Sequence, residues 1–173
     1  GLFPASAGKV VAVGLGGDDT IRGETLLHPA RYFGGDGNDS LVGGRSHDIL
    51  LGGAGADVLA AGLGRDLLIG GLDADQLLGN GAILVGGTTA HDGDSEALES
   101  LLQTWSDPAL SYAARVATLE AGIGHPPVRL HSQTVFADSA ADTLVGRDQV
   151  DWFFAELGVD NKLSPKRPRP PVN

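Results

Sequence analysis

Residues 34–78 read GGDGNDSLV, GGRSHDILL, GGAGADVLA, AGLGRDLLI and GGLDADQLL, so one nine-residue pattern occurs five times in succession. Every copy carries Asp at its sixth place and Leu at its eighth. A fixed short period that keeps its chemistry in phase indicates a solenoid, in which each copy adds one unit to a stack. A glycine-rich linker with scattered acids would not place Asp and Leu in phase five times.

The residue types of the pattern predict a tight turn followed by a short strand. Glycine at places one, two and four permits positive φ and close backbone approach, which a tight turn requires. Side chains alternate across a strand, so the eighth-place Leu is expected to point inward and places seven and nine outward. Stacked turns bring the sixth-place carboxylates into a column beside turn carbonyls. Such a column suits a hard cation such as Ca²⁺, because bare like charges would repel each other.

The pattern resembles the nonapeptide of RTX proteins, which form a calcium-binding parallel β-roll. The resemblance implies a mainly β solenoid that holds several Ca²⁺ ions through the sixth-place aspartates and turn carbonyls. The expected metal-binding residues are Asp19, Asp39, Asp48, Asp57, Asp66, Asp75, Asp36, Gly35, Gly37, Gly44, Gly53 and Gly55. Successive copies of a two-sheet roll feed opposite sheets, so two columns are expected. Asp19, Asp39, Asp57 and Asp75 would lie along one edge, and Asp48 and Asp66 along the other.

The pattern also continues, less regularly, on both sides of the five copies. Residues 14–22 form a sixth copy, and the next unit, 23–33, has two extra residues and no acid at the sixth place. The end of that unit predicts a strand with Tyr32 inward. Residues 79–85 have lost two residues and the Asp. Arg45 and Arg65 place cations in turns, so calcium sites that touch those turns are expected to be weak or empty.

The outer faces of the two expected sheets differ in polarity. One face would be mixed, whereas the other would display Ile49, Leu51, Leu67, Ile69, Ile83 and Val85, a patch too apolar to remain in water. Residues 94–105 predict a helix capped by Asp94, and residues 109–120 predict a second helix with Tyr112, Ala113, Val116 and Leu119 on one stripe. We therefore expect an inserted α-helical hairpin packed on the apolar sheet.

The C-terminal third predicts a return to the roll. Short strands are expected at 128–130, 134–136, 143–145 and 152–154, the last three at intervals of nine residues. Asp142 and Asp151 occupy the sixth place, expected to bind metal, in the copies that end with the last two strands. Most turn glycines of these copies are missing, so weak or absent calcium is expected there. Phe153 would plug the core. The expected organisation is a roll at 1–85, a helical hairpin at 86–127, capping degenerate repeats at 128–160 and a disordered, basic, proline-rich tail at 161–173.

Composition narrows the classes of partner. The formal net charge of −10 excludes nucleic acid and anionic membranes as expected partners and suits a chain that binds several divalent cations. There is no Cys to form disulfides, and no apolar stretch is long enough for a membrane span. There is also no Met, so we read the chain as a piece of a longer protein whose export signal and other domains would lie upstream.

No nucleophile elbow, zinc motif or phosphate loop occurs, so no enzyme activity is expected. Repeats followed by residues 86–89, by Trp105 and Arg115, and by residues 151–154 resemble the C-terminal ends of large secreted or surface bacterial proteins. The resemblance implies a monomeric, extracellular, calcium-dependent structural module. Two alternatives stay open: an adhesion or glycan-binding module, and an export appendage of an upstream protease or lipase. The upstream sequence would separate them.

Overall fold

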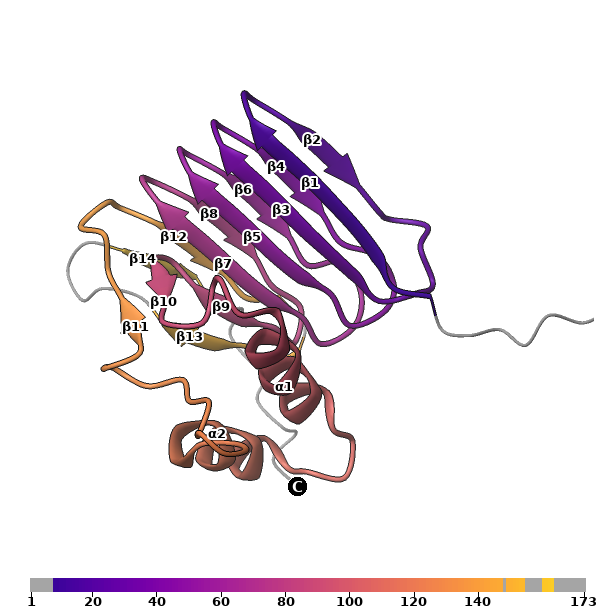
Figure 1. Ribbon diagram of the computed structural model, residues 1–173, viewed down its shortest axis with the longest axis vertical. Coiled ribbons are helices and arrows are strands. Elements are labelled where there is room, and N and C mark those ends of the chain that lie inside the picture. Colours follow the sequence, from indigo (N-terminus) through magenta and orange to yellow (C-terminus); the bar gives the residue numbers. More distant parts are fainter. Residues whose placement is uncertain (1–7, 148, 155–159, 164–173) are drawn as a thin grey trace, which may run out of the picture.

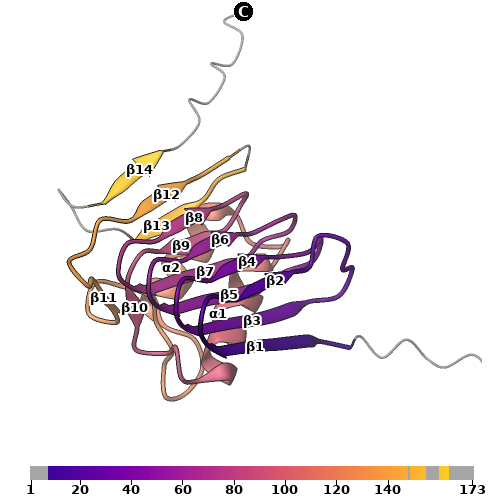
Figure 2. The ribbon, with the colours of Figure 1, turned by 90° about the horizontal axis from the view of Figure 1, so that it is seen from above.

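The chain folds as a two-sheet parallel β-solenoid (Figure 1), and the computed structural model describes residues 8–147, 149–154 and 160–163. In spatial order, the first sheet contains β1 (Val10–Gly16), β3 (Ala30–Asp36), β5 (Ile49–Ala54), β7 (Leu67–Leu72), β9 (Ile83–Val85) and β13 (Trp152–Phe154). The second sheet contains β14 (Asn161–Leu163), β12 (Thr143–Val145), β8 (Gln76–Leu78), β6 (Val58–Ala60), β4 (Ser40–Val42) and β2 (Thr20–Arg22). Each coil adds one strand to each sheet, as Figure 2 shows from above. The expected mainly β, parallel roll is confirmed.

The core between the sheets consists of the middle residues of the repeat strands. Leu41, Leu59 and Leu77 lie in register in the second sheet, and Leu50 pairs with Leu68 in the first. All five side chains are fully buried. The prediction for the eighth-place Leu is therefore confirmed. The register is strongly specified, because a slip of one residue would turn every Leu to the opposite face.

Helix α1 (Ser95–Ser106) covers the outer face of the first sheet, as predicted. It begins at Asp94, whose carboxylate accepts hydrogen bonds from the backbone N–H groups of residues 96 and 97, both at 3.0 Å. The apolar cluster under the helices contains the buried residues Ile49, Leu67, Ile69, Ile83, Val85, Leu98, Leu101, Leu102, Trp105, Leu119 and Leu130. Trp105 also donates its Nε1–H to the carbonyl O of Gly81 at 2.7 Å, which ties the helix to a turn of the roll.

Helix α2 (Tyr112–Ala121) begins later than predicted, because Ser111 caps it by accepting a hydrogen bond from the N–H of residue 114. The predicted stripe is only partly right. Leu119 is buried, but Tyr112 is 37% exposed and Arg115 is buried instead. The guanidinium of Arg115 lies 5.2 Å from the ring centre of Trp105 and donates to its carbonyl O at 3.0 Å. The sequence pattern assigned this face of α2 to apolar side chains. A cation–π contact between Arg115 and Trp105 stabilises it as well.

The roll resumes after the helices. β12 pairs in parallel with β8, and β13 with β9, both in the register that the nine-residue spacing predicts. Phe153 packs against the core between the sheets, as expected of a plug. The outward-facing Trp152 stacks on Trp105, with ring centres 6.1 Å apart.

Three expectations for this region are corrected. Residues 134–136 do not extend the roll; β11 (Val135–Phe136) pairs antiparallel with β10 (Thr88–Thr89), beside the stack. Residues 128–130 form only an isolated bridge between Val128 and Ile123. The segment assigned to a disordered tail starts too early, because β14 at its beginning pairs with β12. Residues 164–173 of that tail lie outside the described residues.

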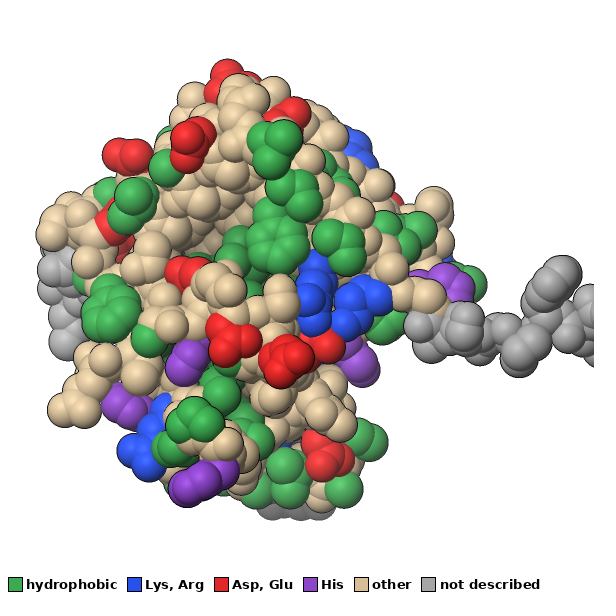
Figure 3. Space-filling model, viewed as in Figure 1, with side chains coloured by type: hydrophobic (Ala, Val, Ile, Leu, Met, Phe, Trp, Pro, Cys, Tyr) green, Lys and Arg blue, Asp and Glu red, His purple; other side chains and the backbone are tan. Residues whose placement is uncertain are grey.

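The outer face of β1 remains uncovered beyond the edge of α1. Val11 and Val13 are 58% and 54% exposed on this strand, and Figure 3 shows hydrophobic side chains of this face next to Lys and Arg side chains. Lys9 and Arg31 both form ion pairs with Glu99 of α1, so charged contacts mark the border of the covered region. Neither helix of the described chain is long and apolar enough to cross a membrane.

Candidate calcium sites along the turn columns

The turns that lead from the first sheet to the second stack their sixth-place aspartates in one column. The backbone N–H of Asp19 donates to Oδ1 of Asp39 at 2.7 Å, Asp39 donates in the same way to Asp57 at 2.7 Å, and Asp57 to Asp75 at 2.8 Å. Each bond joins residues of adjacent coils. We call this stack column one; the sequence predicted its four members.

Column one continues into the degenerate C-terminal copies. Asp75 donates its N–H to Oδ1 of Asp142 at 2.9 Å, and Asp142 donates to Oδ1 of Asp160 at 3.1 Å. Sequence reasoning missed Asp160 as a member. The spacing could have identified it. Asp160 follows Asp142 by 18 residues, which equals two repeats and therefore one coil.

The second carboxylate oxygen of each column-one repeat aspartate is buried without a partner. Oδ2 of Asp19, Asp39, Asp57 and Asp75 accepts no hydrogen bond. The last three residues are at most 2% exposed. A buried acceptor with no donor is costly, and an ionised carboxylate far more so, unless a cation or a proton balances it.

First-place glycines form the wall beside these oxygens. A Cβ on Gly34 would lie 2.1 Å from Oδ2 of Asp39 and 2.6 Å from the carbonyl O of Gly52. A Cβ on Gly52 would lie 2.2 Å from Oδ2 of Asp57 and 2.5 Å from the carbonyl O of Gly70. A side chain in place of Gly34 or Gly52 would therefore displace these oxygen donors. The residues present fit a hard cation held between adjacent turns.

The turns on the opposite edge form column two, and they are less uniform. Oδ1 and Oδ2 of Asp48 accept hydrogen bonds from the N–H groups of Ala30 and Gly44, at 2.7 and 2.6 Å. Asp48 donates its own N–H to Oδ1 of Asp66 at 2.8 Å, and Oδ2 of Asp66 has no partner. The sequence predicted both residues in one column, but the structure distinguishes a satisfied carboxylate from an unsatisfied one.

Asp151 extends column two past the shortened unit. Its Oδ1 accepts hydrogen bonds from the N–H groups of Gly81 and Ala82, both at 2.8 Å. Ala82 occupies the place where a repeat Asp was lost, and it is fully buried. An aspartate distant in sequence thus anchors the turn that lost its own.

The glycine carbonyls expected as ligands also stack from coil to coil. Gly35, Gly37, Gly53 and Gly55 all have positive φ, between 116° and 129°. A Cβ on Gly53 would lie 2.1 Å from the carbonyl O of Gly35, and one on Gly55 would lie 2.4 Å from that of Gly37. These turns therefore require glycine for both conformation and space.

The remaining two expected ligands lie differently. A Cβ on Gly44 would meet the carbonyl O of Leu26 at 2.8 Å, so this glycine also faces a neighbouring coil. Asp36 has an exposed side chain, and its carbonyl O accepts a hydrogen bond from the N–H of Gly17 at 2.7 Å. In the described part of the chain, no three Asp, Glu, His or Cys side chains converge as a metal site. An ion here therefore needs backbone carbonyls as well as carboxylates.

Comparison with protein families identifies the repeat. The profile of the RTX calcium-binding nonapeptide repeat matches residues 5–25, 33–68, 51–82 and 132–161, which together span more than half of the chain. The chain belongs to this RTX repeat family. Comparison with curated proteins and with solved structures finds no match.

RTX repeats bind calcium, a hard cation whose preference for oxygen ligands the residues of these columns fit. The matched segments leave out α1 and α2 and resume at residue 132, before β12 and β13. The glycine-poor end of the chain is therefore RTX repeat, in agreement with its pairing in the roll. RTX repeats are typical of secreted or surface bacterial proteins and form a structural calcium-binding fold.

Without a cation, three of the RTX carboxylates bind protons more tightly than a free aspartate does. Burial raises the pKa of Asp57 to about 6, of Asp75 to about 8 and of Asp66 to about 9, from an ordinary value of 3.8. Hydrogen bonds from backbone N–H groups oppose these shifts, and neighbouring carboxylates in each column add to them. Calcium must therefore displace protons as it binds.

We expect opposite pH dependences with and without calcium. In chelator, the folded roll binds protons more tightly than the unfolded chain does, because its aspartate pKa values are raised. This stabilisation is full below about pH 4 and is lost as pH rises through the folded-state pKa values of about 6, 8 and 9. Residual fold in chelator should therefore increase when pH falls from 8 to 5, whereas the fold in calcium should weaken. Thermal melts across this range measure both slopes; equal slopes would contradict the assignment.

Proposed function

We propose that this RTX roll is a calcium-dependent, non-catalytic folding module of a secreted or cell-surface bacterial protein. The observation that carries the proposal is the stack of buried, unpartnered Oδ2 atoms in column one. In this proposal the repeat aspartates and neighbouring turn carbonyls bind Ca²⁺ between adjacent coils. Helices α1 and α2 cover the first sheet of the roll, and strands β12, β13 and β14 cap its end.

The energetics of the columns support a switch between compartments. Without cations, stacked carboxylates oppose each other and must take up protons before the turns can close. Calcium sites of extracellular modules have dissociation constants of about 0.1–1 mM. Each ion that binds only the folded state adds about RT ln(1 + [L]/Kd) to its stability. The module would thus remain unfolded at low calcium inside the cell and fold outside it.

A calcium titration followed by far-UV circular dichroism tests the proposal. At neutral pH in chelator, the chain should show little strand signal, and millimolar calcium should produce a cooperative transition to the β-roll. Equal concentrations of magnesium serve as the control, because Mg²⁺ demands octahedral geometry and sheds its waters reluctantly. A chain equally folded in excess chelator would overturn the proposed function.

A further inference from the structure

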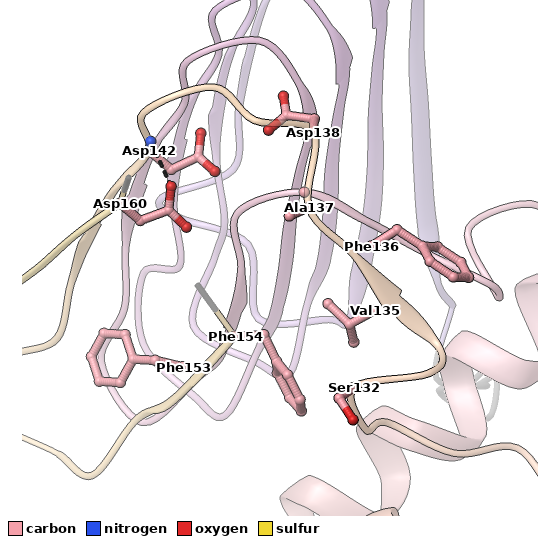
Figure 4. Close-up of a pocket in the computed structure, with 10 residues that line it drawn as sticks. Ser132, Val135, Phe136, Ala137, Asp138, Asp142, Phe153, Phe154 and Asp160 are labelled. Carbon is pink, nitrogen blue, oxygen red and sulfur yellow. Dashed lines mark hydrogen bonds between the residues drawn. The ribbon is translucent and has the colours of Figure 1, made fainter. Parts of the chain in front are cut away.

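A pocket of about 250 Å³ opens beside the last turn of column one (Figure 4). The segment between β11 and β12 forms one side, and the end of β13 forms another. Three carboxylates line the pocket, from Asp138, Asp142 and Asp160. Among the copies that carry Asp at the sixth place and whose second place the structure describes, this is the one with a carboxylate, that of Asp138, at its second place.

Asp138 occupies the second place of the copy whose sixth place is Asp142, where regular copies carry glycine. Its Oδ1 accepts a hydrogen bond from the N–H of Ala140 at 3.0 Å. Its Oδ2 is buried and has no partner. In Figure 4 the carboxylates of Asp138 and Asp142 point toward one another across the pocket. Asp138 thus points a carboxylate with one unpartnered oxygen toward the sixth-place aspartate of its copy.

Other oxygens at this coil boundary are also placed as in the regular copies. A Cβ on Gly86 would lie 2.2 Å from Oδ2 of Asp142, as first-place glycines do elsewhere in column one. Asp75 in the preceding coil is 1% exposed and keeps its Oδ2 unpartnered. That oxygen and the carbonyl O of Gly86 both lie beside Gly70, within 2.4 Å of the position of a Cβ there.

We propose that Asp138 and Asp142 bind one further Ca²⁺ ion at this end of column one. This inference rests on the proposed function, since it assumes that the roll binds calcium, and it reverses the expectation of weak calcium at Asp142. Counted back from Asp142 in the sequence, Asp138 brings a side-chain oxygen where regular copies carry glycine. All-oxygen donors and room for bound water favour Ca²⁺ over softer metals. Asp160 borders the site through its hydrogen bond to the N–H of Asp142.

Counting bound calcium by equilibrium dialysis at pH 7.5 tests the site on the full chain. Asp138→Asn should bind one ion fewer than the wild type, or bind one ion at least tenfold more weakly. The asparagine still offers Oδ1 to Ala140, so the local hydrogen bond survives. Glu120→Gln removes one exposed charge from α2 and is the matched control, with the wild-type ion number expected.

The outcomes separate this site from the roll as a whole. Equal ion numbers and affinities for Asp138→Asn and the wild type would overturn the inference and leave the proposed function intact. A wild type that binds no calcium would overturn the proposed function itself. If Asp138→Asn fails to fold in calcium, rescue of fold and ion number by Asp138→Glu supports the site, and absence of that rescue counts against it.

Discussion

Leu67→Asp should unfold the roll or detach α1 and α2, at a cost of about 4 kcal/mol or more in the free energy of unfolding. Leu67 is fully buried and lies in register between Ile49 and Ile83 in the apolar cluster under the helices. Burying a Leu side chain contributes about 1.5–3 kcal/mol, and an unpaired carboxylate in its place adds a desolvation penalty. Denaturant melts in saturating calcium measure the loss.

Gln76→Asp is the control for Leu67→Asp. It introduces the same charge into β8 of the second sheet, whose outer face is not covered by the helices, and Gln76 is exposed. Surface substitutions of this kind usually change stability by about 0.5 kcal/mol or less. If both variants lose the same stability in calcium, the helices do not stabilise the first sheet in the way described.

Gly52→Ala should abolish one column-one calcium site without removing any charge. The new Cβ would lie 2.2 Å from Oδ2 of Asp57 and 2.5 Å from the carbonyl O of Gly70, and neither can move freely. The carboxylate is held by the N–H of Asp39, and the carbonyl belongs to backbone inside the paired strand β7. Overpacking lowers the stability of the fold by about 1–3 kcal/mol. When free calcium is at about one hundred times the dissociation constant of the site, loss of that site lowers the stability by about 2.7 kcal/mol more.

Gly93→Ala is the matched control, because nothing lies within 4 Å of its Cβ position and its φ is not positive. Calcium titrations of both variants should move the folding midpoint of Gly52→Ala to higher calcium and leave that of Gly93→Ala unchanged. An unshifted midpoint for Gly52→Ala would show that the space beside Asp57 does not hold an ion.

Most of the roll could be predicted because its information is local and periodic. Asp39 and Leu41 recur in phase, and each copy uses the same turn and the same strand, so a correct reading of one copy predicts all the others. The apolar stripe of Ile49, Leu67 and Ile83 predicted that another element packs on this sheet. The helical pattern of α1, with Asp94 as its N-cap, follows shortly after in the sequence. The two columns of aspartates followed from alternation between the sheets.

The degenerate C-terminal end could be read only in part, because its contacts join residues far apart in sequence. The sequence determined that 143–145 and 152–154 are strands in phase with the repeats. It assigned 134–136 to the same stack, but antiparallel pairing with β10 holds that strand outside it. Local periodicity cannot distinguish these cases, since both strands carry the same alternation of side chains.

By itself the sequence determined the repeat, the inward Leu, the columns of aspartates and the metal class of this RTX roll. Only the tertiary structure decided which oxygens are satisfied. Asp48 and Asp57 share one place in the pattern, yet Gly44 donates to Oδ2 of Asp48 while Oδ2 of Asp57 has no donor. It also decided that Asp138 faces Asp142 across a pocket. The reason is physical: a repeat specifies each coil's backbone, but the environment of a carboxylate depends on which donors the neighbouring coils and non-repeat segments bring to it.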